Sequence, residues 1–197
     1  MDNRKQNDNK ESEYILTVDA QDREMGYMEK LEVHRQGILH RAFSLMVFND
    51  KGEILLQKRA RNKYHSPGLW SNACCSHQRT GESLIEAVNR RVREELGFTC
   101  PCKEVFCFPY QVKFDNGLME YEIDHVFFGY YNGKVIPNRD EVEEIRWVSR
   151  DNLNKEMKKY PEKFTYWFRE LMNQPEMLSA EKGFTGDKQL VWQKEKK

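Results

Sequence analysis

Residues 72–77 of this chain read NACCSH and place two thiols and an imidazole within four positions. Such a group could form half of a zinc site, part of a disulfide framework, a nucleophile beside its base, or a packed loop with incidental sulfur. A zinc site is poorly supported, because these cysteines lack the usual C-x2-C spacing and the other close pair is Cys100 and Cys102. The chemistry of the segment therefore depends on what lies beside it.

Other side chains that bind metal ions occur on both sides of this segment. His34 and His40 precede it, and Glu120 and Glu122 follow on a predicted strand, where alternate side chains share one face. Taken singly, a histidine is most often structural, and two such glutamates most often form the wet face of a half-buried sheet. Together with His77 they make a nitrogen and oxygen ligand set for an octahedral divalent ion, which could be magnesium, manganese or zinc.

A basic segment adds positive charge between Lys58 and Lys63, and Pro67 and Gly68 mark the stretch at residues 59–69 as a loop. A basic loop is most often simply solvated. Beside a divalent ion, however, the same cations would suit a phosphorylated substrate bound through a metal bridge. The clusters are ordinary one by one, and together they favour a single site for a phosphorylated ligand.

Hydrophobic periodicity and turn residues predict the elements that must position these groups. Strands are expected at residues 14–19, 40–49, 53–58, 104–114, 119–131 and 142–149, and the turn at 50–52 joins the second and third as a hairpin. One short helix is expected to begin at Asp151, and another, which contains Trp167, at Pro161. This order indicates one α+β domain with a mixed β-sheet sandwiched between helices.

The clearest helix is predicted over residues 81–97. Apolar residues recur along it at spacings of three and four and form one seam: Ile85, Val88, Val92 and Leu96. Arg91 and Glu95 fall a turn apart on one shoulder of this seam, while Glu94 points away. We therefore expect Arg91 and Glu95 to face whatever packs beside the helix.

Composition is typical of a globular protein, with 39% hydrophobic residues in a chain of 197, enough for one domain. Lysine plus arginine equals aspartate plus glutamate at 32 each, so net charge does not argue for nucleic-acid or membrane binding. The sequence shows neither the apolar region of a secretory signal nor the roughly 18 apolar residues of a membrane span. We expect a cytoplasmic protein with reduced cysteines, a flexible tail at 1–13, a domain at 14–174 and a polar tail at 175–197.

Residues 76–98, SHQRTGESLIEAVNRRVREELGF, resemble the Nudix signature G-x5-E-x7-R-E-U-x-E-E-x-G-U. The positions in register are Glu82, Arg90, Glu94, Glu95 and Gly97. Ser76 stands in place of the first glycine, and Arg91 stands where the hydrolases place a glutamate that binds the catalytic metals. The resemblance thus implies a Nudix-type fold in which metal-assisted attack of water on a diphosphate is weakened.

The altered signature and the segments HRAFS, NACCSH and EYE resemble the type I isopentenyl-diphosphate isomerases over residues 14–168. That family interconverts isopentenyl and dimethylallyl diphosphate. The resemblance implies that Cys75 is the catalytic cysteine and Glu122 the second acid/base. It also implies that Tyr110 is the active-site tyrosine and that Trp167 faces the carbocation.

The same resemblance implies which ions and small molecules the chain binds. The residues implied as ligands of a divalent ion (magnesium, manganese or zinc) are His34, His40, His77, Glu120 and Glu122. A magnesium ion held through the substrate diphosphate would use Glu95. The implied diphosphate-binding cations are Lys30, Arg59, Lys63 and Arg91. An isoprenoid diphosphate is the expected partner, with no nucleic acid and no membrane, for a monomer or weak dimer.

The implied reaction adds a proton at one end of an unactivated alkene and removes another proton through a tertiary carbocation. Cys75 and Glu122 would flank the substrate and divide these transfers. The main alternative is a Nudix pyrophosphohydrolase that acts on a nucleoside or isoprenoid diphosphate through Glu82, Glu94 and Glu95. A different alternative is a non-catalytic binding domain that a metal ion stabilises.

Overall fold

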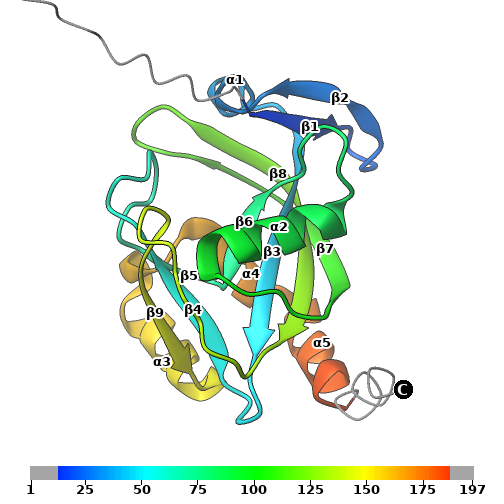
Figure 1. The fold of residues 1–197 in the computed structure, drawn as a ribbon. Helices are drawn as coiled ribbons and strands as arrows, with labels where there is room; N and C mark the ends of the chain where they lie inside the picture. The colour runs from blue at the N-terminus through cyan, green and yellow to red at the C-terminus, as the bar shows by residue number, and fades with distance from the viewer. Residues whose placement is uncertain (1–12, 187–197) are drawn as a thin grey trace, which may run out of the picture.

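The computed structural model describes residues 13–186, which form one nine-stranded mixed sheet with helices on both sides (Figure 1). The strands are β1 (Tyr14–Val18), β2 (Glu24–Glu29), β3 (His40–Phe48), β4 (Ile54–Arg59), β5 (Trp70–Ser71), β6 (Cys74–His77), β7 (Cys102–Lys113), β8 (Met119–Tyr130) and β9 (Val142–Val148). The helices are α1 (Lys30–Gln36), α2 (Leu84–Leu96), α3 (Arg150–Lys159), the 3-10 turn η1 (Pro161–Lys163), α4 (Tyr166–Asn173) and α5 (Pro175–Gly186).

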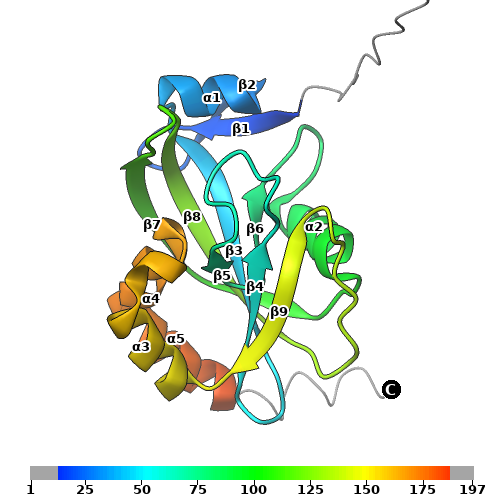
Figure 2. The same cartoon turned by 90° about the vertical axis from the view of Figure 1, so that its left-hand side faces the viewer.

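The helices lie in two layers. Figures 1 and 2 show α2 over one face of the curled sheet and α3, α4 and α5 together over the other, while α1 lies beside β1 and β2 at one end. β3 runs parallel to β8 and antiparallel to β6, so the sheet is mixed. The expected α+β fold, with a mixed sheet sandwiched between helices, is confirmed.

β3 is apolar on both faces because it separates two cores. Phe43, Leu45 and Val47 pack toward α2, whereas Met46 and Phe48 pack in the cluster under α3–α5. This alternation follows from the period of two along a strand. A strand buried on both faces reads as a nearly continuous apolar run, as residues 42–48 do apart from Ser44.

The predicted hairpin of β3 and β4 forms but splays apart almost at once. The two strands pair only between Phe48 and Ile54. Beyond that pair β4 bonds to β9 and β5, while β3 bonds to β6 and β8. The divergence leaves a gap between two halves of the sheet, and the side chains that enter it come from β3, β4, β6 and β8.

Local signals define α2 closely. Ser83 caps its amino end in a capping box with Glu86, each side chain bonding the other's backbone. Gly97 ends the helix at φ 75°, where a side chain would also meet the carbonyl oxygen of Ile136 at 2.7 Å. The expected seam needs one correction: Ile85 is 41% exposed, and Leu84 and Ala87 of the same turn contact the core instead.

The carboxyl-terminal helices differ from expectation in two places. Pro161 opens only the short turn η1, and Trp167 lies in the separate helix α4. The segment from 175, predicted as a polar tail, begins with α5, whose Met177 is fully buried in the core under α3–α5. Met177, Ala180 and Phe184 recur at spacings of three and four and all contact this core, so the helix carries an apolar stripe among its polar residues. Residues 187–197 and 1–12 lie outside the described residues.

We expect replacement of Met177 by alanine to lower the free energy of unfolding by about 2–5 kcal/mol, since a fully buried methionine leaves a cavity. Leu178→Ala is the matched control, because Leu178 is 56% exposed and should cost little. Denaturant unfolding of both variants measures the difference. Equal stabilities would show that α5 contributes nothing to the core.

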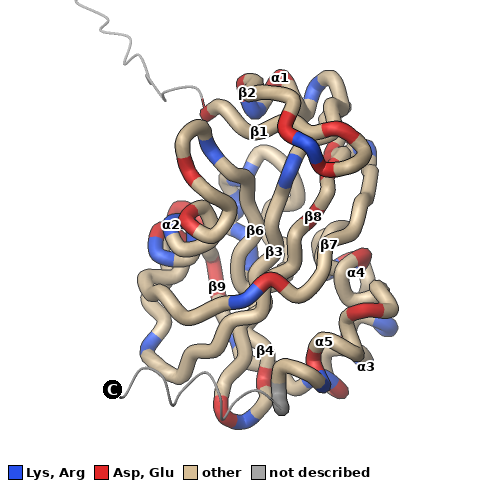
Figure 3. The backbone as a smooth tube through the Cα atoms, turned by 90° about the vertical axis from the view of Figure 1, so that its right-hand side faces the viewer, with Lys and Arg blue, Asp and Glu red and all other residues tan. Residues whose placement is uncertain are grey.

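Charges of both signs are interspersed along the chain, most visibly on α2 and around α1 and β2 (Figure 3). No helix within residues 13–186 combines the length and apolar character needed to cross a membrane. The five cysteines all carry free thiols. These features agree with a charge-balanced globular domain.

Candidate active site

One pocket opens where β3 and β4 diverge, and it collects side chains from most of the sheet. The predicted site residues that line it are Lys30, Arg59, Lys63, Cys75, His77, Arg91, Glu95, Tyr110, Glu120, Glu122 and Trp167. The two other predicted residues, His34 and His40, lie behind it in contact with Glu120 and Glu122. Register explains the grouping, because His40 on β3, Glu122 on β8 and Tyr110 on β7 are directly opposed and therefore share one face.

The five predicted metal ligands form one buried cluster. Each of His34, His40, His77, Glu120 and Glu122 offers one ligand atom, and these atoms lie within 4.8 Å of one another. Nε2 of His77 lies 2.9 Å from Oε1 of Glu122, and Nε2 of His34 lies 3.0 Å from Oε2 of Glu120. A buried cluster of this composition could hold a divalent ion.

Hydrogen bonds on the far side of two imidazoles prepare them for a metal. Nδ1 of His34 lies 2.5 Å from the carbonyl oxygen of Lys30, and Nδ1 of His40 lies 2.8 Å from that of Ile38. A carbonyl only accepts, so each Nδ1 carries the hydrogen and each Nε2 keeps a bare lone pair toward the cluster. Nε2 of His34 and Oε2 of Glu120 have no hydrogen-bond partner among the described residues, which fits a cation between them.

The two glutamates of the cluster differ in their surroundings. Burial and the nearby charge of Glu122 raise the pKa of Glu120 well above its usual value. Burial acts in the same sense on Glu122, but the close imidazoles of His40 and His77 outweigh it and lower the pKa of that carboxyl. The hydroxyl of Tyr110 also donates to Oε2 of Glu122 at 2.6 Å. Of the two, Glu122 is therefore the carboxyl that stays ionised, whereas Glu120 takes up a proton more readily.

The Cys75 thiol is held by two close polar neighbours, Asn72 and Ser44. It donates to Oδ1 of Asn72 at 2.8 Å and lies 3.4 Å from Oγ of Ser44, which itself donates to Asp124 at 2.7 Å. The amide nitrogen of Asn72 bonds to two backbone carbonyls, which fixes its oxygen toward the thiol. Burial, with the charge of Asp124, raises the pKa of Cys75 to about 12, so the group is a thiol at neutral pH.

This pKa predicts slow alkylation of Cys75 that accelerates with pH. Because only the thiolate reacts, its rate with iodoacetamide should still rise about tenfold per pH unit between pH 8 and 10, where an ordinary thiol with a pKa near 8.5 levels off. Peptide mass spectrometry resolves Cys75 from the exposed Cys107, which controls for access of the reagent, while a small free thiol gives the ordinary pH profile. A plateau for Cys75 below pH 9 would contradict the assignment.

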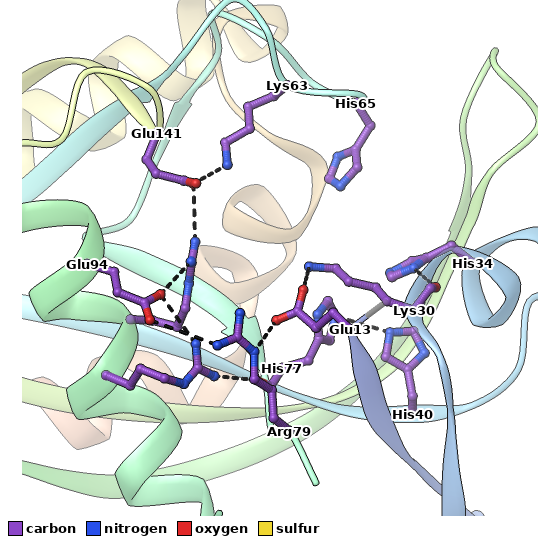
Figure 4. A network of polar contacts seen from close by, with 12 residues as sticks. Glu13, Lys30, His34, His40, Lys63, His65, His77, Arg79, Glu94 and Glu141 are labelled. Atoms are coloured by element: carbon purple, nitrogen blue, oxygen red, sulfur yellow. Dashed lines mark hydrogen bonds and ion pairs between the residues drawn. The ribbon is translucent and has the colours of Figure 1, made fainter. Parts of the chain in front are cut away.

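Two carboxylates engage the predicted diphosphate-binding cations (Figure 4). Lys63 and Arg91 both bond to Oε2 of Glu141, which approaches from the segment before β9. Burial raises the pKa of Glu141, but these two cations outweigh it and lower the pKa overall. The pair of cations is thus held together at one side of the pocket.

In the same network, Glu13 bridges Lys30 and Arg79 (Figure 4). Its oxygens lie 3.1 Å from Nζ of Lys30 and 2.6 Å from Nε of Arg79. Burial alone would raise the pKa of Glu13, but the two cations lower it to about 2. Glu13, predicted to belong to a flexible tail, is therefore tied to the rim of the site.

Known proteins are similar to the chain in both sequence and structure. The NUDIX domain family matches residues 38–168. Isopentenyl-diphosphate Delta-isomerase 2 of Photorhabdus laumondii is 47% identical over 161 residues, which cover 82% of this chain and 91% of that protein. Isopentenyl-diphosphate Delta-isomerase of Burkholderia multivorans is 46% identical over 156 residues, 79% of this chain and 89% of that protein. The chain belongs to the isopentenyl-diphosphate Delta-isomerase family.

Solved structures agree on the fold. The MutT protein of Methanosarcina mazei superposes with a TM-score of 0.56 at 27% identity and covers 68% of this chain and 90% of that one. A MutT NUDIX hydrolase of Burkholderia pseudomallei gives a TM-score of 0.55 at 22% identity, over 70% of this chain and 98% of that one. The expected Nudix-type fold is confirmed.

Within this family fold, the carboxylates of α2 are arranged unlike a complete hydrolase centre. Glu82 is engaged by Arg90 at 2.6 Å, and the side chain of Glu94 is 39% exposed. Of the three glutamates that match the signature, only Glu95 lines the pocket, with Oε2 accepting from Gln57 at 2.9 Å. Arg91 occupies the position beside it and pairs with Oε1 of Glu95.

Some pocket residues of this family member were not predicted from the sequence. Asp124 continues the alternation of Glu120 and Glu122 on β8 and is fully buried beside Ser44. His65 enters from the basic loop after β4, where its sequence neighbours gave no sign of a partner. The alternation could have identified Asp124, whereas nothing local could have placed His65.

Proposed function

We propose that this chain interconverts isopentenyl and dimethylallyl diphosphate by moving protons at the two ends of an allylic carbon unit, as a step of isoprenoid biosynthesis. One observation carries the proposal: a thiol, a buried carboxylate and four cations line the same pocket beside a cluster of metal ligands. The relatives that support it are named as isomerases of this diphosphate.

The proton transfers fall to Cys75 and Glu122. One of them donates a proton to the terminal methylene of the substrate, which leaves a tertiary cation. The other removes a proton from the methylene carbon that lies between the cationic carbon and the diphosphate end. The double bond thereby moves by one position, and the composition of the substrate is unchanged. Tyr110 holds Oε2 of Glu122 and thereby aims its carboxyl group.

The tertiary cation forms no hydrogen bonds, so it needs an electron-rich surface. Trp167 supplies an indole face in the pocket, a contact worth up to roughly 2 kcal/mol when water is excluded. Its Nε1 donates to Oγ of Ser71 at 3.0 Å, which fixes the plane of the ring. The guanidinium of Arg59 lies 5.1 Å from the centroid of this ring, a contact that supports the proposed role.

The diphosphate would be held by Lys30, Arg59, Lys63 and Arg91. These cations bind a part of the substrate remote from the reacting carbons, and this binding energy holds a small apolar tail still. Glu95 would contact a magnesium ion bound to the diphosphate. Glu13 and Glu141 keep the cations gathered before an anion arrives.

The metal cluster would hold a divalent ion through His34, His40, His77, Glu120 and Glu122. When bound, the ion supplies positive charge that stabilises the ionised form of Glu122. We propose magnesium, manganese or zinc for this site, since all three accept these ligands. The chain would act in the cytoplasm as a monomer or weak dimer, with its small-molecule substrate as partner and neither nucleic acid nor membrane involved.

The experiment that tests the function is incubation with isopentenyl diphosphate and magnesium in deuterated water, followed by NMR. Deuterium in a dimethylallyl product supports the isomerase. Release of phosphate without isomerisation would support the Nudix pyrophosphohydrolase, which Arg91 and the outward Glu94 disfavour. A melting temperature that falls on chelation, with no turnover of any diphosphate, would support a metal-stabilised binding domain.

A further inference from the structure

His65 occupies a buried position beside the metal cluster. It lies in the loop between β4 and β5 and is 9% exposed. Figure 4 shows it on the same loop as Lys63, near Lys30 and His34 of α1. Its Nε2 lies 3.3 Å from Oε1 of Glu120.

The two oxygens of Glu120 face different partners. Oε2 lies 3.0 Å from Nε2 of His34 and 3.7 Å from Nε2 of His40, on the side of the cluster. Oε1 faces His65 instead. The carboxylate is therefore turned so that one oxygen is available to a cation and the other to the loop.

Aromatic neighbours set the plane of the His65 ring. It stacks on Phe114 with centroids 5.2 Å apart and planes at 12°, and it meets Trp167 edge-on at 5.5 Å and Tyr64 edge-on at 4.5 Å. Its backbone carbonyl accepts from Nη2 of Arg59 at 3.2 Å. A ring fixed on three sides can present Nε2 to Glu120 in only one direction.

We propose that His65 is a positioning residue for the metal site: it donates Nε2–H to Oε1 of Glu120 and so directs Oε2 to the divalent ion. Outer hydrogen bonds of this kind orient a ligating carboxylate, and their loss typically costs about 10–100-fold in metal affinity. The inference rests on the metal site of the proposed function. It adds a residue that the ligand cluster itself does not contain.

Two substitutions separate the hydrogen bond from the ring stacking. His65→Phe keeps the flat ring against Phe114 but has no donor, whereas His65→Gln loses the ring but places an amide N–H near the position of Nε2. Titration of each apo protein with Mn²⁺, with free Mn²⁺ measured by its EPR signal, gives the affinity. The melting temperature of the apo proteins reports stability independently.

The proposal expects His65→Phe to bind Mn²⁺ about 10–100-fold more weakly than the wild type, with His65→Gln within about threefold of it. Wild-type affinity in His65→Phe overturns the proposal, as does equal weakening in both variants, which would indicate a stacking role. If the wild type itself binds no Mn²⁺, the proposed metal site fails as well. If the wild type binds and His65→Phe is unchanged, only the inference about His65 fails.

Discussion

Replacement of Cys75 by alanine is expected to lower the rate of isomerisation by roughly 10⁴-fold, the upper end of what a positioned acid or base contributes. An unactivated alkene is protonated only when an acid is positioned beside it. Among the described residues, no thiol other than that of Cys75 lines the pocket and could take over this role. The substrate should still bind, because the cations proposed to hold the diphosphate remain. The measurement is deuterium exchange and product formation by NMR, with binding followed by calorimetry.

Cys74 is the matched control for this prediction. It is fully buried, packs in the core toward α2 and does not line the pocket, although it is the adjacent residue. Cys74→Ala should lower stability and leave the turnover of folded protein within a few-fold of the wild type. Near-normal isomerisation by Cys75→Ala, or an equal loss in both variants, would remove Cys75 from the mechanism.

Replacement of Glu122 by glutamine is expected to have at least as large an effect, again roughly 10⁴-fold on turnover. The amide can neither take up nor give a proton at this position. It also loses the charge that binds a divalent ion and that His40 and His77 now contact. The hydroxyl of Tyr110 keeps a carbonyl oxygen to donate to, so the side chain should stay in place.

Glu120→Gln is the control that separates metal binding by Glu122 from proton transfer by Glu122. Glu120 belongs to the same cluster, but the proposed proton transfers do not use it. Activity of Glu120→Gln should therefore recover as Mg²⁺ or Mn²⁺ is raised, whereas that of Glu122→Gln should not recover at any concentration. If excess metal rescues Glu122→Gln, the glutamate is a ligand and not an acid/base.

The position of Arg91 explains how one fold supports a different reaction. In the hydrolase signature a glutamate stands there, and an arginine at the same point cannot bind a metal ion. In the structure its guanidinium pairs with Glu95 and Glu141 and lines the pocket. The substitution removes a carboxylate from the hydrolytic set and places a positive charge where a diphosphate can use it.

Local patterns in the sequence predicted the elements whose bounds or faces are set by capping residues, glycines or strand alternation. The helix with Ser83 at one end and Gly97 at the other formed within a few residues of its predicted bounds, because capping and glycine geometry act over one turn. Glu120 and Glu122 share a face because strand geometry alone requires it. The turn at residues 50–52 was also predicted from local turn residues, and the strands on either side of it pair as a hairpin.

Features that depend on distant partners were not predictable in this way. α1 brings His34 to the cluster, yet its seven residues are too few to be helical without tertiary contacts. The divergence of β3 from β4 arises because each finds better partners elsewhere in the sheet. α5 is held by the packing of Met177, Ala180 and Phe184 against a core that other elements supply.

By itself, the sequence determined which residue types are present, which faces of α2 and β8 they occupy, and the family to which the chain belongs. The tertiary structure decided which of them meet. His65 and Glu120 are far apart in the chain, and their contact exists only because the loop after β4 folds over the end of β8. Burying such polar groups is costly unless partners surround them, and only the whole fold can supply those partners.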